Sequence, residues 1–223
     1  EMLRSLVGSE MCIRDRLVEG NKVIFDYQWH HVTLPKWEQV SKDNYVAWAR
    51  FYLYVDEVSR NEAWVSKVVL TRKKAELVSA IFKENVPEID EWLIKIDAIV
   101  RHAWIKTKIL VSSNFDEIDP VWTLIWQKWI RVKAVMDELS WEKIDIIPNS
   151  EDKTLVIKKA LSPADVIKVE IDEENQKANA YILVSQRAKA VWKNGINVNL
   201  AAKLTWYKIS IIDVEAVSYT HLT

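Results

Sequence analysis

LIWQKWIRVKAVMDELSWEKIDII, from Leu124 to Ile147, and AVWKNGINVNLAAKLTWYKISII, from Ala190 to Ile212, are two copies of one pattern. Each copy starts with an aliphatic residue, Trp, two polar residues, Trp or Gly, and then Ile. A helical run follows and ends at Leu-Ser-Trp or Leu-Thr-Trp, after which the spacing becomes that of a short strand. A repeated supersecondary unit predicts two tandem domains rather than one large sheet.

The segments that precede the two copies repeat as well. A helical segment from Lys74 to Glu84 precedes the first copy, and a second from Lys153 to Leu161 precedes the second copy. Two strand-like runs follow each helix: LIKIDAIV, IKTKILV, DVIKVEI and ANAYILV. Asp119 and Pro120 have the composition of a helix start, with Asp119 as the cap. Both units read helix, strand, strand, helix, loop, helix, strand, so the sequence predicts an α+β fold.

The composition is that of an ordinary globular protein. The chain has 223 residues, is 49% hydrophobic and 28% charged, and carries a formal net charge of -1. This charge does not by itself indicate a nucleic-acid partner, so any such partner must be argued from local features. No uninterrupted apolar run approaches the roughly 18 residues of a membrane span. The single cysteine, Cys12, excludes an internal disulfide.

One ratio in the composition is abnormal. The chain has 12 Trp and 3 Gly, whereas about 7% glycine predicts roughly 16 Gly. The surplus of Trp nearly equals the deficit of Gly. One interpretation is a tryptophan-rich protein with aromatic ligand platforms. The other is that Trp stands where glycine belongs, as when UGA codons that encode glycine are translated as Trp.

The positions of the tryptophans favour the second interpretation. Trp141 and Trp206 each follow a helix and precede a strand, where a left-handed backbone favours glycine. Trp104 lies between two strand-like runs, which is another glycine position. Trp129 occupies the position in the first copy that Gly195 occupies in the second. We therefore expect several of these Trp residues to have positive φ or unusual exposure.

Both ends of the chain have the character of foreign sequence. The stretch LVGSEMCIRDR, which ends at Arg16, and AVSYTHLT, which begins at Ala216, resemble translated sequencing adapters from transposon ends. MCIRDR and VSYTHL back-translate to near reverse complements. We therefore expect residues 1–16 and 216–223 to be adapter-derived, and we exclude them from the reasoning about the fold.

Signs of catalysis and metal binding are weak. The adjacent His30 and His31 have no third ligand at a sensible spacing. No carboxylate pair, phosphate-binding loop or nucleophile elbow is recognisable. The sequence therefore predicts no catalytic residues, no metal site and no cofactor.

With Trp read as Gly, the two loops become GQKG and GKNG, which are instances of the G-x-x-G pattern of KH domains. The chain then resembles the NusA family of bacterial transcription termination and antitermination factors. The resemblance covers about Val40 to Asp213 and depends on segments that include VPEIDEW, RHAWIKTKILV, IDPVWTLIWQKWIRV, LSPADV and AVWKNGINVNLAAKLTW. DNYVAWARFYLYVDEV and VSKVVLTR are similar to the later strands of the OB-fold domain of that family.

The resemblance implies a domain plan. We expect a partial OB-fold β-barrel with RNA-binding function at residues 17–72. Two type II KH domains are expected at 73–149 and 150–215. We expect these 223 residues to contain no counterpart of the amino-terminal polymerase-binding domain of the family.

The resemblance also implies a function. We expect a cytoplasmic, monomeric RNA-binding elongation factor that contacts nascent single-stranded RNA and RNA polymerase, without catalysis and without a membrane partner. It would modulate pausing, termination and antitermination. An alternative is the RNA-feeding KH and OB portion of a ribonuclease or another KH protein. However, phosphorolytic exonucleases place one KH domain before the OB domain, whereas here the OB-like segment precedes two KH-like units.

The RNA-binding residues are expected in and just after the two loops, because a KH loop clamps about four nucleotides along their backbone. Helix N-termini attract phosphate, and lysines in the loops add positive charge. The expected residues are Trp126, Gln127, Lys128, Trp129 and Arg131 in the first copy and Trp192, Lys193, Asn194, Gly195 and Asn197 in the second.

Overall fold

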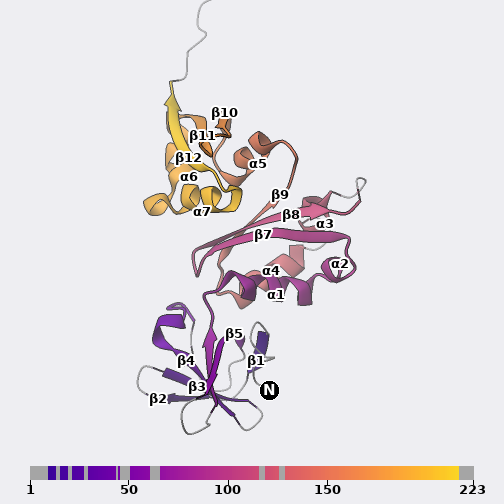
Figure 1. The fold of residues 1–223 in the computed structure, drawn as a ribbon, viewed down its shortest axis with the longest axis vertical. Coiled ribbons are helices and arrows are strands. Elements are labelled where there is room, and N and C mark those ends of the chain that lie inside the picture. The colour runs from indigo at the N-terminus through magenta and orange to yellow at the C-terminus, as the bar shows by residue number, and fades with distance from the viewer. Residues whose placement is uncertain are drawn as a thin grey trace, which may run out of the picture. The chain divides into compact units, whose positions relative to one another are not determined.

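The computed structural model describes residues 10–13, 16–19, 22–27, 30–43, 45, 51–60, 66–115, 119–125 and 129–215. The chain divides into two compact units that each draw on several segments. Unit 1 consists of Glu1–Leu93, Arg101–Ile105 and Trp122–Lys143, and unit 2 of Ile94–Val100, Lys106–Val121 and Ile144–Thr223. Figure 1 shows the course of the chain from indigo to yellow.

Unit 1 contains a six-stranded sheet. Its strands are β1 (Glu10–Ile13), β2 (Arg16–Glu19), β3 (Lys22–Tyr27), β4 (His30–Pro35), β5 (Phe51–Arg60) and β6 (Ser66–Thr71). They lie in the order β1-β5-β6-β4-β3-β2, with β4 and β6 parallel and the other pairs antiparallel. Because this order is linear, the sheet is not closed, and the expected barrel is not seen in the described part of the chain. β1 lies within the segment that we expected to be adapter-derived.

Alternation along the strands gives this sheet its core. Residues two apart on a strand share a face, and the buried side chains follow that period in β3, β4, β5 and β6. The core consists of Val23, Phe25, Val32, Leu34, Phe51, Leu53, Val55, Val68 and Leu70. One face of the sheet is therefore apolar.

Within the described residues, unit 1 contains the helices η2 (Lys36–Glu38), α1 (Ala75–Asn85), α2 (Pro87–Asp90) and α4 (Trp129–Glu138), together with most of α3 (Pro120–Ile125). Leu77, Val78, Ile81 and Phe82 give α1 an apolar stripe at helical spacing. α4 packs against α1 and buries Val132 and Val135.

A buried arginine joins the end of β6 to the end of α4 within unit 1. Arg72 Nε lies 2.6 Å from Asp43 Oδ2, and Nη2 donates to the backbone oxygen of Glu138 at 2.8 Å. Nη1 reaches Glu138 Oε1 at 3.2 Å and the backbone oxygen of Tyr52 at 2.7 Å. The side chains of Arg72 and Asp43 are only 2% and 1% exposed. Burial of a paired guanidinium makes each partner costly to remove.

Unit 2 holds most of the remaining elements. The strands β7 (Ile94–His102), β8 (Lys106–Ser113) and β9 (Lys143–Pro148) form one three-stranded sheet in that order, and α3 (Pro120–Ile125) follows β8 in the chain. Asp119 Oδ1 accepts a hydrogen bond from the backbone N–H of Val121 at 2.8 Å. The expected cap of this helix is therefore confirmed.

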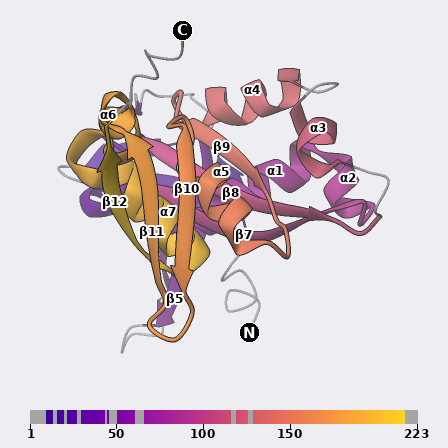
Figure 2. The ribbon, with the colours of Figure 1, turned by 90° about the horizontal axis from the view of Figure 1, so that it is seen from above.

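The last third of the chain repeats the order of helices and strands that runs from α1 to β9. Its elements are α5 (Lys153–Ala160), β10 (Val166–Asp172), β11 (Lys177–Leu183), η3 (Val184–Gln186), α6 (Arg187–Val191), η4 (Lys193–Gly195), α7 (Ile196–Thr205) and β12 (Lys208–Val214). The sheet order is β10-β11-β12, with β10 antiparallel and β12 parallel to β11. Figure 2 shows these strands side by side with α7 behind them. The repeated order of elements that the sequence predicted is confirmed.

The core of unit 2 lies between α5, α7 and the strands. Its buried residues are Leu110, Ile147, Val156, Ile157, Ala160, Leu161, Val169, Ala178, Ala180, Ala201 and Leu204. Small alanines on β11 and α7 are among these buried residues, so α7 packs on this core. The loop before α7 is thereby held by a packed element.

Candidate nucleic-acid interface

The second loop connects α6 to α7 through a tight turn. Trp192 caps α6 with φ 47° and ψ 155°, and residues Lys193 to Gly195 form one 3-10 turn. The backbone N–H of Gly195 donates to the oxygen of Trp192 at 2.8 Å. Asn194 and Gly195 have φ 55° and 79°. Three of the four loop residues, Trp192, Asn194 and Gly195, thus have a positive φ, which favours glycine.

Gly195 is required by its backbone rather than by space. A Cβ at this position would meet its nearest neighbour, Asn199 Nδ2, at 3.4 Å, which is an ordinary contact. Instead, its φ of 79° is what restricts the residue type, because residues with a Cβ rarely adopt it. This agrees with the expectation that the loop is of the glycine-containing kind.

The loop presents polar groups and a helix end. Lys193 and Asn194 are exposed, and α7 starts at Ile196 without a side-chain cap. The first N–H groups of a helix have no partner within the helix and attract anions. Lysine, amide and helix terminus together can hold a phosphodiester backbone.

Asn197 lies elsewhere than the sequence analysis expected. Its side chain is fully buried, and Nδ2 donates to the backbone oxygens of Leu161 and Ala190 at 3.1 and 3.0 Å. It therefore does not reach the surface beside the loop. Instead, it ties the start of α7 to the end of α6 and to the turn after α5. One residue of sequence displacement on a helix rotates a side chain by about 100°, which the pattern alone did not resolve.

The first loop is only partly described. Trp126, Gln127 and Lys128 lie outside the described residues. Trp129 is the first residue of α4. Arg131 is half-buried, and its Nη1 lies 3.0 Å from Glu88 Oε2 of α2. Arg131 therefore has a carboxylate partner in the structure.

The tryptophans of the turns have the backbone that the sequence analysis expected. Trp104, Trp141, Trp192 and Trp206 have φ of 58°, 62°, 47° and 62°, and this prediction is confirmed. The side chains of Trp141 and Trp206 are 63% and 81% exposed. Trp92, which the sequence analysis did not single out, also has a positive φ of 59°. Its place after a short helix and before a strand was the signal that could have identified it.

Two buried lysines of β8 were also missed, one of which contacts Trp192 of the second loop. Lys106 and Lys108 are buried in β8, and both lie beside Asp145 of β9. Burial lowers the pKa of Lys108 to about 8, although the carboxylate of Asp145 opposes that shift. The signal in the sequence was the run KTK at the start of an otherwise apolar strand.

Other kinds of site find little support. Among the residues that the structure describes, no three His, Cys, Asp or Glu side chains gather in a way that could hold a metal ion. Within the same ranges, no helix is long and apolar enough to cross a membrane.

Comparison with protein families gives two matches. The NusA-like first KH domain matches residues 72–149, and the NusA-like second KH domain matches residues 153–218. Together these matches cover more than half of the chain.

Comparison with curated proteins finds relatives named transcription termination/antitermination protein NusA. The relative from Thermus thermophilus is 36% identical over 82% of this chain and 47% of its own length. The one from Halalkalibacterium halodurans is 34% identical over 80% and 46%. The one from Rickettsia conorii is 32% identical over 90% and 40%. The chain thus spans about half the length of the relatives it matches.

Proposed function

Because the chain belongs to the NusA family and carries its two KH domains, we propose that it is the RNA-binding part of a transcription elongation factor. The observation that carries the proposal is the second loop. There, an exposed lysine and amide stand before the uncapped start of α7. The two loops would hold nascent single-stranded RNA.

The chemistry of the loop favours a phosphodiester backbone over a base edge. A KH loop clamps about four nucleotides. Lys193 supplies charge, the N–H groups of α7 supply donors, and positive φ at 192, 194 and 195 lets phosphates approach the main chain. In the first loop we assign the same roles to Gln127 and Lys128, between positions 126 and 129. Arg131 would add positive charge when its guanidinium leaves the Glu88 carboxylate and pairs with an RNA phosphate instead.

Asn197 takes a different role in this proposal. Because its amide is buried and holds backbone oxygens on both sides of α6 and α7, it positions the loop rather than contacting RNA. Its Oδ1 has no hydrogen-bond partner among the described residues.

The glycine form of the loops is part of the proposal. We infer that position 192 carries glycine in the functional protein, because Trp192 has a φ and ψ that L-residues strongly disfavour. We extend the inference to positions 126 and 129 because they occupy the places of 192 and Gly195 in the first copy of the repeat. Indoles at these positions would occupy the space that backbone phosphates need.

The wider role follows from the relatives, whose names state transcription termination and antitermination. We propose that the protein acts as a cytoplasmic monomer on RNA polymerase and nascent RNA, and modulates pausing, termination and antitermination without catalytic turnover. The strands of residues 17–72 would be part of an OB-fold that extends the RNA path, and both KH domains would be of type II. The ribonuclease alternative is not favoured by these relatives.

An RNA titration tests the proposal. The Trp126→Gly, Trp129→Gly, Trp192→Gly form should bind a short fluorescein-labelled oligoadenylate, and the sequence as it stands should bind poorly. Affinity should fall with salt, with a slope in log K against log salt of about -0.7 per phosphate contacted. Equal binding by both forms would mean that the loops are not the site.

Loop variants locate the binding within the chain. Replacing Gln127-Lys128 or Lys193-Asn194 by Asp-Asp should weaken binding at least about tenfold, since each removes charge-assisted contacts. The matched control replaces Gln176-Lys177, exposed at the turn between β10 and β11, by Asp-Asp, which changes the net charge by the same amount as the Lys193-Asn194 change. An equal loss of RNA affinity in this control would mean that the loop variants act only through the net charge of the protein.

A further inference from the structure

Two lysines of β8 share one carboxylate. Lys106 Nζ lies 2.7 Å and Lys108 Nζ 2.6 Å from Asp145 Oδ2. Residues two apart on a strand point to the same side, so both ammonium groups lie on one face of β8. Their side chains are 5% and 0% exposed. Two ammonium groups and one carboxylate leave one positive charge that Asp145 does not neutralise.

The two lysines are not equivalent. Lys108 is the deeper one, and its Nζ also lies 3.4 Å from the backbone oxygen of Ser162. It has no route to an external anion. Lys106 Nζ instead lies 5.4 Å from the centroid of the Trp192 ring. Lys106 is therefore the lysine of this pair that contacts the second loop.

The indole of Trp192 lies within cation–π distance of the Lys106 ammonium group. The face of an aromatic ring carries negative potential and attracts an ammonium group. Trp192 is the first residue of the second loop, and its φ of 47° and ψ of 155° belong to a glycine-type backbone. Lys106, Asp145 and Trp192 all belong to unit 2, so their spacing is internal to one compact body. Glycine at position 192 would open Lys106 toward the loop.

We propose that Lys106 is a phosphate-binding residue of the second loop, which takes a backbone phosphate of the RNA strand in the place now held by the Trp192 indole. The proposal deepens the function proposed above and rests on it. Lys108 keeps Asp145 neutralised, so that the carboxylate does not repel the incoming phosphate. A phosphate oxygen forms a shorter and stronger hydrogen bond with an ammonium than a neutral acceptor does. The RNA path would thus run from the loop onto the start of β8.

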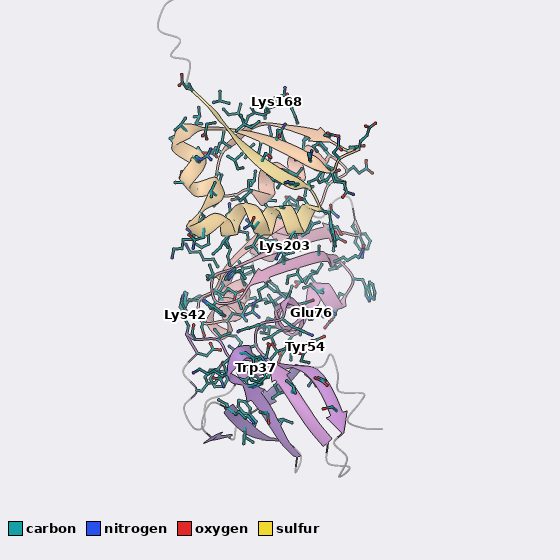
Figure 3. All side chains as sticks on the ribbon, turned by 60° about the vertical axis from the view of Figure 1, so that its left-hand side comes forward. Trp37, Lys42, Tyr54, Glu76, Lys168 and Lys203 are labelled. Atoms are coloured by element: carbon teal, nitrogen blue, oxygen red, sulfur yellow. The ribbon has the colours of Figure 1, made fainter. Side chains whose placement is uncertain are left out.

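The test compares variants in a Trp192→Gly background, which keeps the tryptophans of the first loop so that binding reports on the second. Adding Lys106→Gln should lower the affinity for a short labelled oligoadenylate about tenfold and reduce the salt slope by about 0.7. Adding Lys106→Arg should retain most of the affinity. The matched control is Lys203→Gln, which removes one exposed ammonium from α7 (Figure 3). An effect of Lys106→Gln no larger than that of Lys203→Gln would overturn the proposal.

Two further measurements separate failure of the inference from failure of the proposed function. If Lys193→Asp with Asn194→Asp weakens binding but Lys106→Gln does not, the loop binds RNA and only the role of Lys106 is wrong. If neither change matters, the loop itself is not the site. Amine labelling read by mass spectrometry tests Lys106 without altering it. Its labelling should rise in Trp192→Gly relative to the sequence as it stands and fall when oligoadenylate is added, and no protection by RNA would contradict the proposal.

Discussion

Replacing Trp206 by glycine should stabilise unit 2, which is the reverse of the usual effect of removing a tryptophan. Trp206 caps α7 in the left-handed conformation, with φ 62° and ψ 19°. Its side chain is 81% exposed, so its removal uncovers little apolar surface. The change tests whether the backbone at the end of α7 is of the glycine type.

The magnitude follows from two opposing effects. A left-handed conformation costs an L-residue about 1–2 kcal/mol, and glycine is spared that cost. Glycine in turn gives the unfolded chain more freedom, which offsets about 0.4–1 kcal/mol. The expected net gain in the free energy of unfolding is about 1 kcal/mol.

Urea unfolding followed by far-UV circular dichroism measures this gain. With a urea dependence of about 2 kcal/mol/M, the midpoint should rise by about 0.5 M. Hydrogen exchange of the β11 amides reports on unit 2 if the two units unfold separately.

The matched control is Leu155→Gly in α5, which lies in the same unit. Leu155 is also a large exposed apolar residue, at 49%, but it lies inside a helix. Glycine there should cost about 1 kcal/mol. If Trp206→Gly destabilises the protein as much as Leu155→Gly does, the argument from φ is refuted.

Three other predictions follow from particular contacts and turns. Arg72→Met should destabilise unit 1 by about 3–5 kcal/mol, because it leaves the carboxylates of Asp43 and Glu138 without their guanidinium. Lys168, which is labelled in Figure 3, forms an exposed ion pair with Glu170, and Lys168→Met should leave the urea midpoint unchanged. Because the pKa of Lys108 falls from 10.5 to about 8 on folding, the unfolded chain binds the extra proton between those values. The free energy of unfolding should therefore rise with pH across that window by about 3 kcal/mol, and fall again as pH drops toward 8. Lys108→Met should abolish this rise in pH-dependent urea unfolding, and an unchanged pH profile would contradict the burial argument. The codons of Trp104, Trp126, Trp129, Trp141, Trp192 and Trp206 should be TGA and that of Gly195 should be GGN, which sequencing of the gene decides; TGG at several of them would exclude recoding.

The sequence by itself determined the repeat and the order of its elements. Helical and strand periodicities are local, so they identified the two helix, strand, strand, helix, loop, helix, strand units before any contact was known. The sequence also predicted where the backbone has a positive φ. The place of Trp141 and Trp206 between a helix and a strand predicted a left-handed φ, which both residues have.

Contacts between distant segments were decided only by the tertiary structure. Asn197 follows the loop in sequence, yet packing of α7 turns its amide inward against Leu161. Lys108 and Asp145 come from separate strands, and Arg72 meets Glu138 across the fold of unit 1. The linear order of the six strands likewise follows from pairing rather than from alternation, because a strand pattern names a buried face but not its neighbour. Periodicity predicts which side chains of a segment are buried. The partner of a buried charge depends instead on which distant segments pack against each other in the folded chain.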